Sequence, residues 1–140
     1  MRIAAVVQDV WSICEVLNAR GDGVLADIST EKDMDRCVAF LEHAARHGPE
    51  AFGENRTHHV GDDPKVWQFD VTGTLRLLYF YDEGRVVVLT KAFYKSGGKS
   101  GKTPKALIKA AQKLYTDYMR AKQANTLEIE EIDDGDEDES

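Results

Sequence analysis

Hydrophobic and polar residues follow strand-like patterns between residues 66 and 93. VWQFDV at 66–71 alternates with a period of two, LRLLYFY at 75–81 is apolar apart from one arginine, and residues 85–93 form a further segment rich in β-branched and apolar residues. Short segments of this kind are typical of β-strands. Gly73 separates the first two segments, and Asp82-Glu83-Gly84 predicts a hairpin turn before the third. Because such short turns join antiparallel neighbours, we expect an antiparallel meander.

A helical period appears in two places. Apolar residues recur at three- and four-residue spacing over residues 34–47, which predicts an amphipathic helix. Thr30 and Asp33 are typical of its N-terminal cap, and Gly48-Pro49 of its end. The apolar residues after Thr103-Pro104 have the same spacing and predict a final helix, with the threonine as its N-cap.

The segments outside these patterns give weaker signals. Asp9–Asn18 is rich in β-formers and predicts a first strand, although a helix also fits it. Residues 24–28 predict a short helix. Residues 51–65 are polar and rich in turn formers, so we interpret them as a loop.

Charge is divided unevenly along the chain. The 140 residues have a net charge of −7 and a hydrophobic fraction of 42%, which fits a single globular domain. Residues 128–140 hold nine acids and no Lys or Arg. Because this segment has too few apolar residues to offset the entropy cost of ordering, we predict one domain over residues 1–127 and a disordered acidic tail over 128–140.

The segment from Arg85 to Lys122 has the opposite character. It contains ten Lys or Arg residues and a single acid, with four aromatic residues among them. A cationic surface with interleaved aromatic rings indicates a polyanionic partner, and RNA is the first candidate. For any one lysine, an ordinary solvated side chain is the simpler interpretation. The candidates for RNA binding are Lys91, Tyr94, Lys99, Lys102, Lys105 and Lys109.

Several other classes of protein are disfavoured. Cys14 and Cys37 show no metal or redox spacing, so we expect reduced core cysteines and no metal or other cofactor. Without a recognisable secretion leader or an apolar run long enough to span a bilayer, we expect a cytoplasmic protein that does not bind membranes. SGGKSGKT at 96–103 approaches a phosphate-binding loop, but Ser96 replaces its first glycine and Pro104 removes a backbone donor. We therefore do not expect a nucleotide cofactor.

Arg76 is the sharpest single candidate for a functional residue. It lies within the apolar segment at 75–81, where a buried guanidinium must find a partner or open onto a cleft. One possibility is an ion pair with Asp70 or Asp82 on a neighbouring strand. The other is a phosphate bound by the guanidinium on the face of the sheet.

His58 and His59 lie just before the meander. Histidine transfers protons near neutral pH, so either residue is a candidate general acid or base beside bound RNA. The alternative is a pair of loop histidines without a catalytic role.

The motifs between residues 66 and 120 resemble the RelE-like toxin superfamily, and within it the HigB-like, phage-derived branch. The matching residues are Trp67, Arg76 with Tyr79-Phe80, Phe93 to Lys95, and Lys102 to Pro104. The resemblance implies an α+β fold with two packed helices, a curved antiparallel sheet of about four strands and a C-terminal helix. It also implies metal-independent cleavage of messenger RNA, usually on the ribosome, and neutralisation by a cognate antitoxin.

The chemistry implied by this resemblance is attack of a 2′-hydroxyl on the adjacent phosphate. An endoribonuclease of this kind needs positive charge beside the transition state and a group that transfers protons. By resemblance, Arg76 and Lys95 are the candidates for the first role. For the second role, the candidates are His58 and His59, on the chemistry of histidine alone.

The chain departs from the family pattern at several positions. The family's glutamate and arginine on the first meander strand are Gln68 and Asp70 here, and an insertion separates Lys95 from Lys102. A non-catalytic RNA- or protein-binding module of phage or plasmid origin is therefore the second hypothesis. Inhibition of gyrase, as in related toxins, is the third.

Overall fold

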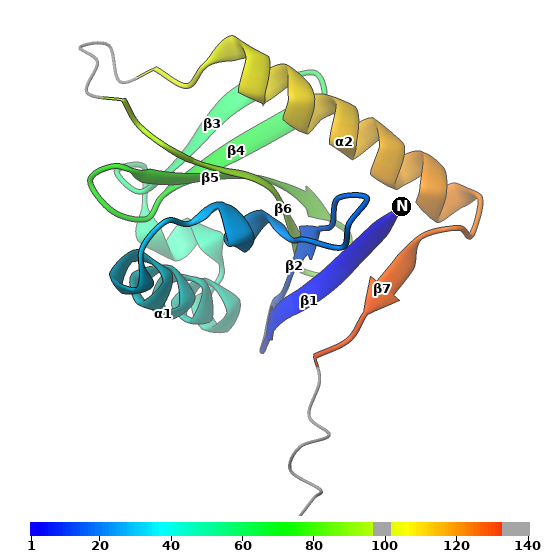
Figure 1. The fold of residues 1–140 in the computed structure, drawn as a ribbon, viewed down its shortest axis with the longest axis horizontal. Coiled ribbons are helices and arrows are strands. Elements are labelled where there is room, and N and C mark those ends of the chain that lie inside the picture. The colour runs from blue at the N-terminus through cyan, green and yellow to red at the C-terminus, as the bar shows by residue number, and fades with distance from the viewer. Residues whose placement is uncertain (97–101, 133–140) are drawn as a thin grey trace, which may run out of the picture.

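A mixed β-sheet with a helix on each face makes up residues 1–96 and 102–132, the part of the chain that the computed structural model describes (Figure 1). Hydrogen-bonded neighbours follow the order β3-β4-β5-β6-β2-β1-β7. The strands are β1 (Arg2–Gln8), β2 (Ser12–Val16), β3 (Thr57–Asp62), β4 (Lys65–Asp70), β5 (Leu75–Asp82), β6 (Val86–Tyr94) and β7 (Glu128–Glu130). The helices are α1 (Glu31–His47) and α2 (Lys105–Gln123), with short 3-10 helices at Val24–Asp27 and Pro49–Phe52.

The predicted meander is present as β4, β5 and β6, which pair antiparallel in succession. Gly84, with a φ of +80°, lies in the turn between β5 and β6, and glycine adopts this left-handed conformation without steric cost. The register places Asp70 opposite Arg76, and Arg76 opposite Phe93. These three residues therefore lie side by side on adjacent strands and on the same face of the sheet.

The sheet is larger and less uniform than the sequence predicts. The described residues form seven strands rather than about four, and two of the pairings, β2 with β6 and β1 with β7, are parallel. The first predicted strand begins only at Ser12, and β1 precedes it. Residues 57–62, expected to be a loop, form β3 at the edge of the sheet. The sequence does not predict this strand, because its two histidines and Gly61 break the alternation of apolar and polar residues. An edge strand can have such a sequence, since it needs few buried apolar side chains.

The two helices cover opposite faces of the sheet, which corrects the expected packed pair (Figure 1). On one face, Phe40 of α1 meets Phe69 of β4 edge-on, with ring centroids 5.1 Å apart. On the other, Phe80 of β5 meets Tyr115 of α2 with ring centroids 5.0 Å apart. Each helix is therefore held by its own set of sheet residues.

The start of α1 follows the sequence prediction, and the start of α2 does not. The side chain of Thr30 accepts a hydrogen bond from the Asp33 N–H at 3.1 Å, which confirms the cap of α1. Gly48 follows this helix, also as predicted. The N-cap of α2 is Pro104 rather than Thr103, and no side chain caps this helix.

A smaller apolar cluster holds α2 against the sheet and is formed by Val66, Leu78 and Ala111. At Gly61, a Cβ atom would lie 2.8 Å from Cγ2 of Ile108, so only glycine lets the helix approach β3 this closely. The first turns of α2 are therefore fixed close over the β3–β4 edge of the sheet.

Asp82 fixes the other end of α2. Its carboxylate accepts hydrogen bonds from Tyr118 Oη at 2.6 Å and from Lys122 Nζ at 2.8 Å, and only 5% of its side chain is exposed. Burial acts to raise the pKa of Asp82, but these two bonds and one from the Glu83 N–H outweigh it and lower the pKa below its ordinary value. The ionised carboxylate is therefore stabilised in the folded protein.

We predict that Asp82→Ala lowers the free energy of unfolding at pH 7 by about 2 kcal/mol, because two donors lose a charged acceptor. A lowered pKa contributes stability above the unfolded-state pKa, and this stability is lost as the pH falls through the folded-state value. The difference between the two proteins should therefore shrink as the pH falls below about 4, the ordinary pKa of an aspartate. Urea unfolding of both proteins at several pH values, with Asp62→Ala as an exposed control, measures it. A difference that stays constant down to pH 2 would contradict the prediction.

Cys14 and Cys37 are buried free thiols, as expected for core cysteines. Burial raises the pKa of Cys14 to about 11 and that of Cys37 to about 12. Both thiols therefore stay protonated and weakly nucleophilic at neutral pH. In the described part of the chain, neither helix has the length and apolar character needed to cross a membrane.

Strand β7 shows that the prediction of a disordered tail is wrong at residues 128–130. The Glu128 N–H donates to the Met1 carbonyl oxygen at 2.9 Å, and β7 pairs in parallel with β1. Its side chains are exposed, so backbone hydrogen bonds and an Arg2–Glu130 ion pair at 3.4 Å hold it. Such pairing needs no apolar side chains, which is why the sequence does not predict this strand. Residues 131 and 132 follow without regular secondary structure, and residues 133–140 of the predicted tail lie outside the described residues.

Candidate phosphate-binding site

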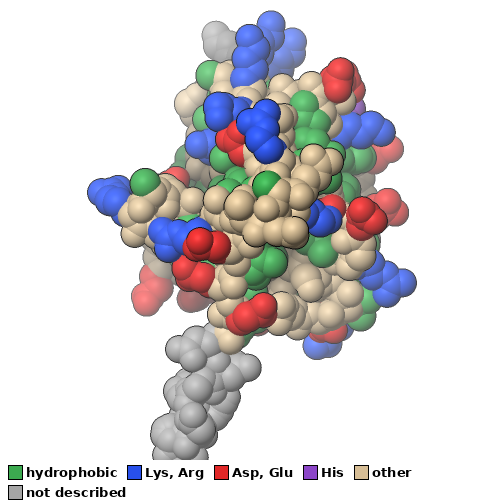
Figure 2. All heavy atoms as spheres, turned by 90° about the vertical axis from the view of Figure 1, so that its right-hand side faces the viewer, with side chains coloured by type: hydrophobic (Ala, Val, Ile, Leu, Met, Phe, Trp, Pro, Cys, Tyr) green, Lys and Arg blue, Asp and Glu red, His purple; other side chains and the backbone are tan. Residues whose placement is uncertain are grey.

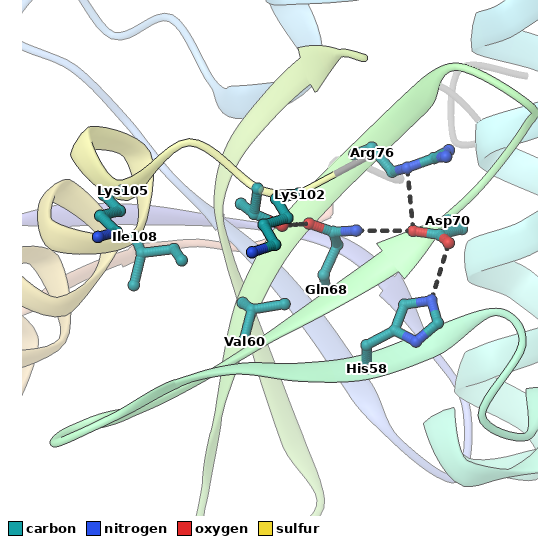
Figure 3. A pocket seen from close by; sticks show the side chains of 9 residues that line it. His58, Val60, Gln68, Asp70, Arg76, Lys102, Lys105 and Ile108 are labelled. Carbon is teal, nitrogen blue, oxygen red and sulfur yellow. Dashed lines mark hydrogen bonds and ion pairs between the residues drawn. The ribbon is translucent and has the colours of Figure 1, made fainter. Parts of the chain in front are cut away.

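A cavity of about 420 Å³ opens beside the first turns of α2 (Figure 3). Strands β3, β4 and β5 supply one side of it, and the segment that leads into α2 supplies the other. Seven of its nine lining side chains are polar or charged, so it suits a polar ligand. The lining residues are His58, Val60, Gln68, Asp70, Arg76, Lys102, Thr103, Lys105 and Ile108.

Asp70 is the centre of the hydrogen-bond network in this cavity. Its Oδ1 accepts a hydrogen bond from Gln68 Nε2 at 2.8 Å and forms an ion pair with Arg76, whose Nε lies 3.1 Å away. Its Oδ2 binds His58 Nε2 at 2.8 Å (Figure 3). A carboxylate only accepts hydrogen bonds, so His58 carries a hydrogen on Nε2. In the neutral imidazole, Nδ1 is then the nitrogen that can take up a proton.

Gln68 connects this network to α2. It is 5% exposed, its Nε2 donates to Asp70, and its Oε1 accepts a hydrogen bond from Thr103 Oγ1. Thr103 immediately precedes the residue that caps α2. The same chain of hydrogen bonds therefore fixes the start of α2 relative to the meander.

Arg76 is largely buried, with 11% of its side chain exposed. Its Nε forms an ion pair with Asp70 Oδ1 at 3.1 Å, and its Nη1 donates to the Thr72 carbonyl oxygen at 2.7 Å. The ion-pair alternative is thus confirmed for Asp70. It does not hold for Asp82, whose carboxylate binds Lys122 instead.

The cations of the cavity lie at two separate ends. Figure 3 shows the Arg76 guanidinium beside Asp70 and pointing away from Lys102 and Lys105, with Gln68 between them. The structure therefore places the arginine and these two lysines on one cavity without bringing their charged groups together. A ligand that meets both ends must extend across Gln68.

Lys95 is not among the side chains that line the cavity, but its backbone lies next to the strand that carries Arg76. Its N–H donates to the Thr74 carbonyl oxygen at 2.7 Å, which continues the β5–β6 ladder by one residue. Because Arg76 pairs with Phe93, strand alternation places Lys95 on the same face, diagonally across from Arg76. Cβ atoms in such diagonal positions are about 7 Å apart, which is within reach of one phosphate group for these long side chains.

The remaining lysines are spread more widely. Lys109 is exposed one turn after Lys105 on α2, and Lys91 lines a different cavity together with Thr90 and Leu114. Lys99 lies outside the described residues. Figure 2 shows blue, basic side chains gathered at the top of the molecule, the level at which Figure 1 draws the start of α2. Basic residues thus concentrate around the entrance to α2.

His59 lies outside the cavity. It follows His58 along β3, so its side chain projects from the opposite face of the strand. There its ring centroid is 5.2 Å from that of Trp67, and its Nε2 is 3.3 Å from Asp62. Of the two candidate histidines, the structure brings only His58 together with Arg76.

Tyr94 also lies away from the cavity. Its hydroxyl donates to Asp33 Oδ2 at 2.8 Å and accepts from the Ser29 N–H at 3.1 Å, both at the start of α1. The ring therefore contributes to the α1 face of the sheet. The structure does not place it where it could stack on a base bound at Arg76.

Gln68 and Thr103 belong to the site, although the sequence prediction gives them no site role, and Asp70 is predicted only as a possible partner of Arg76. The alternation of VWQFDV contains the missing signal, because residues 66, 68 and 70 share one face of a strand. Two polar side chains next to Val66 on that face indicate a boundary between apolar packing and a polar cavity.

Comparison with known proteins supports the family resemblance. The family model described as Phage derived protein Gp49-like (DUF891) matches residues 27–116, a range that contains every residue lining the cavity. The chain therefore belongs to this phage-derived family, which is associated with the toxins of toxin–antitoxin systems. No curated protein matches the chain.

Proposed function

We propose that this protein is an RNA-cleaving toxin of a type II toxin–antitoxin system, an endoribonuclease of the RelE-like and HigB-like kind that cuts messenger RNA on the ribosome. The observation that carries the proposal is the attachment of Arg76 and His58 to the same carboxylate, Asp70, inside one polar cavity. A phosphate-binding cation and a proton-transfer group at such short separation are what 2′-hydroxyl attack on a phosphodiester requires.

In the proposed reaction, the scissile phosphate binds the Arg76 guanidinium, with Lys95 on its other side. His58 Nδ1 takes the proton from the 2′-hydroxyl as O2′ forms a bond to phosphorus. The bond between phosphorus and O5′ breaks, and O5′ takes a proton from solvent. Arg76 and Lys95 stabilise the negative charge that builds up on the phosphate oxygens. The products are a 2′,3′-cyclic phosphate and a 5′-hydroxyl.

The lysine end of the cavity binds a neighbouring part of the RNA backbone in this proposal. Lys102 and Lys105 line it, and Lys109 continues along the exposed side of α2. The first turn of α2 has no side-chain cap, so its backbone N–H groups and helix dipole add positive potential at the same place. These contacts increase affinity without reading the base sequence.

The proposed partners are therefore messenger RNA, on the ribosome, and a cognate antitoxin protein. Brief induction of the full chain in growing bacteria, followed by mapping of transcript 5′ ends, tests the activity. New 5′-hydroxyl ends within coding regions, together with arrested growth, are expected. Transcripts that stay intact while growth stops would contradict RNA cleavage.

A second candidate function is a non-catalytic RNA- or protein-binding module. One observation favours it: Arg76 forms an ion pair with Asp70. The family pattern has an arginine at position 70, which would leave Arg76 without this carboxylate. Intact transcripts combined with retained binding of RNA to the purified protein would support this function over the first.

A further inference from the structure

We propose that Asp70 is a positioning residue with two opposed effects: it occupies Arg76 in the free protein, where the RNA phosphate must replace it, and it orients His58 for proton transfer. The inference rests on the proposed function and deepens it. It predicts that the site binds RNA more weakly than it would without the Asp70 carboxylate. It also predicts that cleavage depends on the same carboxylate.

The first effect follows from charge. Asp70 is the single acid among the residues that line the cavity, and its side chain is 20% exposed. It forms an ion pair with the Arg76 guanidinium, the cation that a bound phosphate would also use. Within the described residues, Nη2 of Arg76 makes no hydrogen bond, so a phosphate has a first point of attachment before it displaces the carboxylate. A carboxylate this close also repels the incoming phosphate.

The second effect follows from the hydrogen-bonding rules of carboxylate and imidazole. Because Asp70 accepts from His58 Nε2, the neutral imidazole keeps Nδ1 unprotonated and ready to act as a base. Asparagine at position 70 would present one oxygen and one NH₂ group. Its oxygen must face the Gln68 Nε2 donor and the Arg76 cation, so its NH₂ faces His58. The imidazole must then accept at Nε2 and carry its hydrogen on Nδ1.

Asp70→Asn is therefore expected to separate binding from turnover. Affinity is measured with a short single-stranded RNA that is 2′-O-methylated throughout, which binds but offers no attacking hydroxyl. We expect this RNA to bind about tenfold more tightly at low salt, because a repulsive charge is gone. Cleavage of the unmodified RNA should fall by about 100-fold or more, because Nδ1 no longer accepts a proton. The ¹⁵N resonances of His58 should show the hydrogen moving from Nε2 to Nδ1.

Asp62→Asn is the matched control, since this exposed acid pairs with the neighbouring His59 at 3.3 Å outside the cavity. It should leave the affinity, the cleavage rate and the His58 tautomer unchanged. If Asp70→Asn binds the methylated RNA no more tightly than the native protein and the His58 tautomer is retained, the inference is overturned.

A measurement on the native protein does not depend on how the variant folds. The Arg76 Nε–H resonance is followed while the methylated RNA is added. Exchange of a carboxylate for a phosphate predicts a large shift of this resonance at saturation, and an unshifted resonance overturns the exchange.

The outcome is distinguishable from that of the proposed function. A native protein that cuts no RNA, but whose Asp70→Asn variant binds methylated RNA more tightly, refutes the enzyme and keeps the exchange at Arg76. A native protein that cuts RNA, with an Asp70→Asn variant unchanged in binding and rate, keeps the enzyme and refutes the role of Asp70.

Discussion

Arg76→Ala is expected to abolish growth inhibition and to lower the rate of RNA cleavage by about 100- to 1,000-fold, the usual loss when one preorganised donor to a developing oxyanion is removed. The guanidinium is the buried cation of the cavity, and Asp70 and the Thr72 carbonyl oxygen hold it in place. Arg76→Lys should recover little of the activity, because an ammonium group cannot donate to Asp70 and a phosphate with the same planar geometry. Growth after induction and the cleavage rate of the purified variants measure both effects.

The interpretation depends on a folded variant, since removing Arg76 leaves a half-buried carboxylate with fewer donors. Thermal unfolding and circular dichroism of the purified protein provide this check. Arg85→Ala is the matched control, because Arg85 is exposed in the β5–β6 turn and is not among the cavity residues. A folded Arg76→Ala variant that remains as toxic as the native chain would show that the site lies elsewhere.

His58→Ala is expected to lower cleavage by about 100-fold or more while leaving RNA binding nearly unchanged. The imidazole supplies proton transfer in the proposed mechanism, whereas the affinity comes mainly from Arg76 and the lysines. The adjacent His59→Ala variant is a close control. It removes the same side chain from the same strand, but on the face that carries Trp67 and Asp62.

The two histidine variants are compared by single-turnover cleavage and by binding of 2′-O-methylated RNA. Equal activity of both variants would remove His58 from the mechanism. Loss of activity in the His59 variant alone would place proton transfer on the other face of β3 and contradict the cavity as the active site.

The sequence predicts those elements whose own residues carry a hydrophobic period or a capping motif. The meander from residue 66 to 93 alternates or is mostly apolar, and α1 has both a helical period and the Thr30 cap, so each is found where expected. By contrast, β3 and β7 are held mainly by pairing with β4 and β1. Their side chains are largely polar or exposed, so the ladder hydrogen bonds that hold them leave no hydrophobic pattern to detect.

The site is predictable in its residue types but not in its connections. Burial of Arg76 inside an apolar strand requires a partner, and the sequence identifies Asp70 as one of two possibilities. The choice between His58 and His59 depends on the existence of β3, because only strand geometry sends neighbouring side chains to opposite faces. The hydrogen bond from Thr103 to Gln68 joins residues 35 positions apart, and no local rule reveals it.

The most direct test of the account is the chemistry of the cut ends. The purified full chain is added, with excess chelator for transition metals, to translating ribosomes that carry a labelled messenger. The experiment is repeated with a messenger that is 2′-O-methylated at the nucleotide 5′ to the cut. The account predicts a 2′,3′-cyclic phosphate and a 5′-hydroxyl from the first messenger, and no cleavage of the second. Ends with a 3′-hydroxyl and a 5′-phosphate, or undiminished cutting of the methylated messenger, would contradict attack by the 2′-hydroxyl at the Arg76–His58 site.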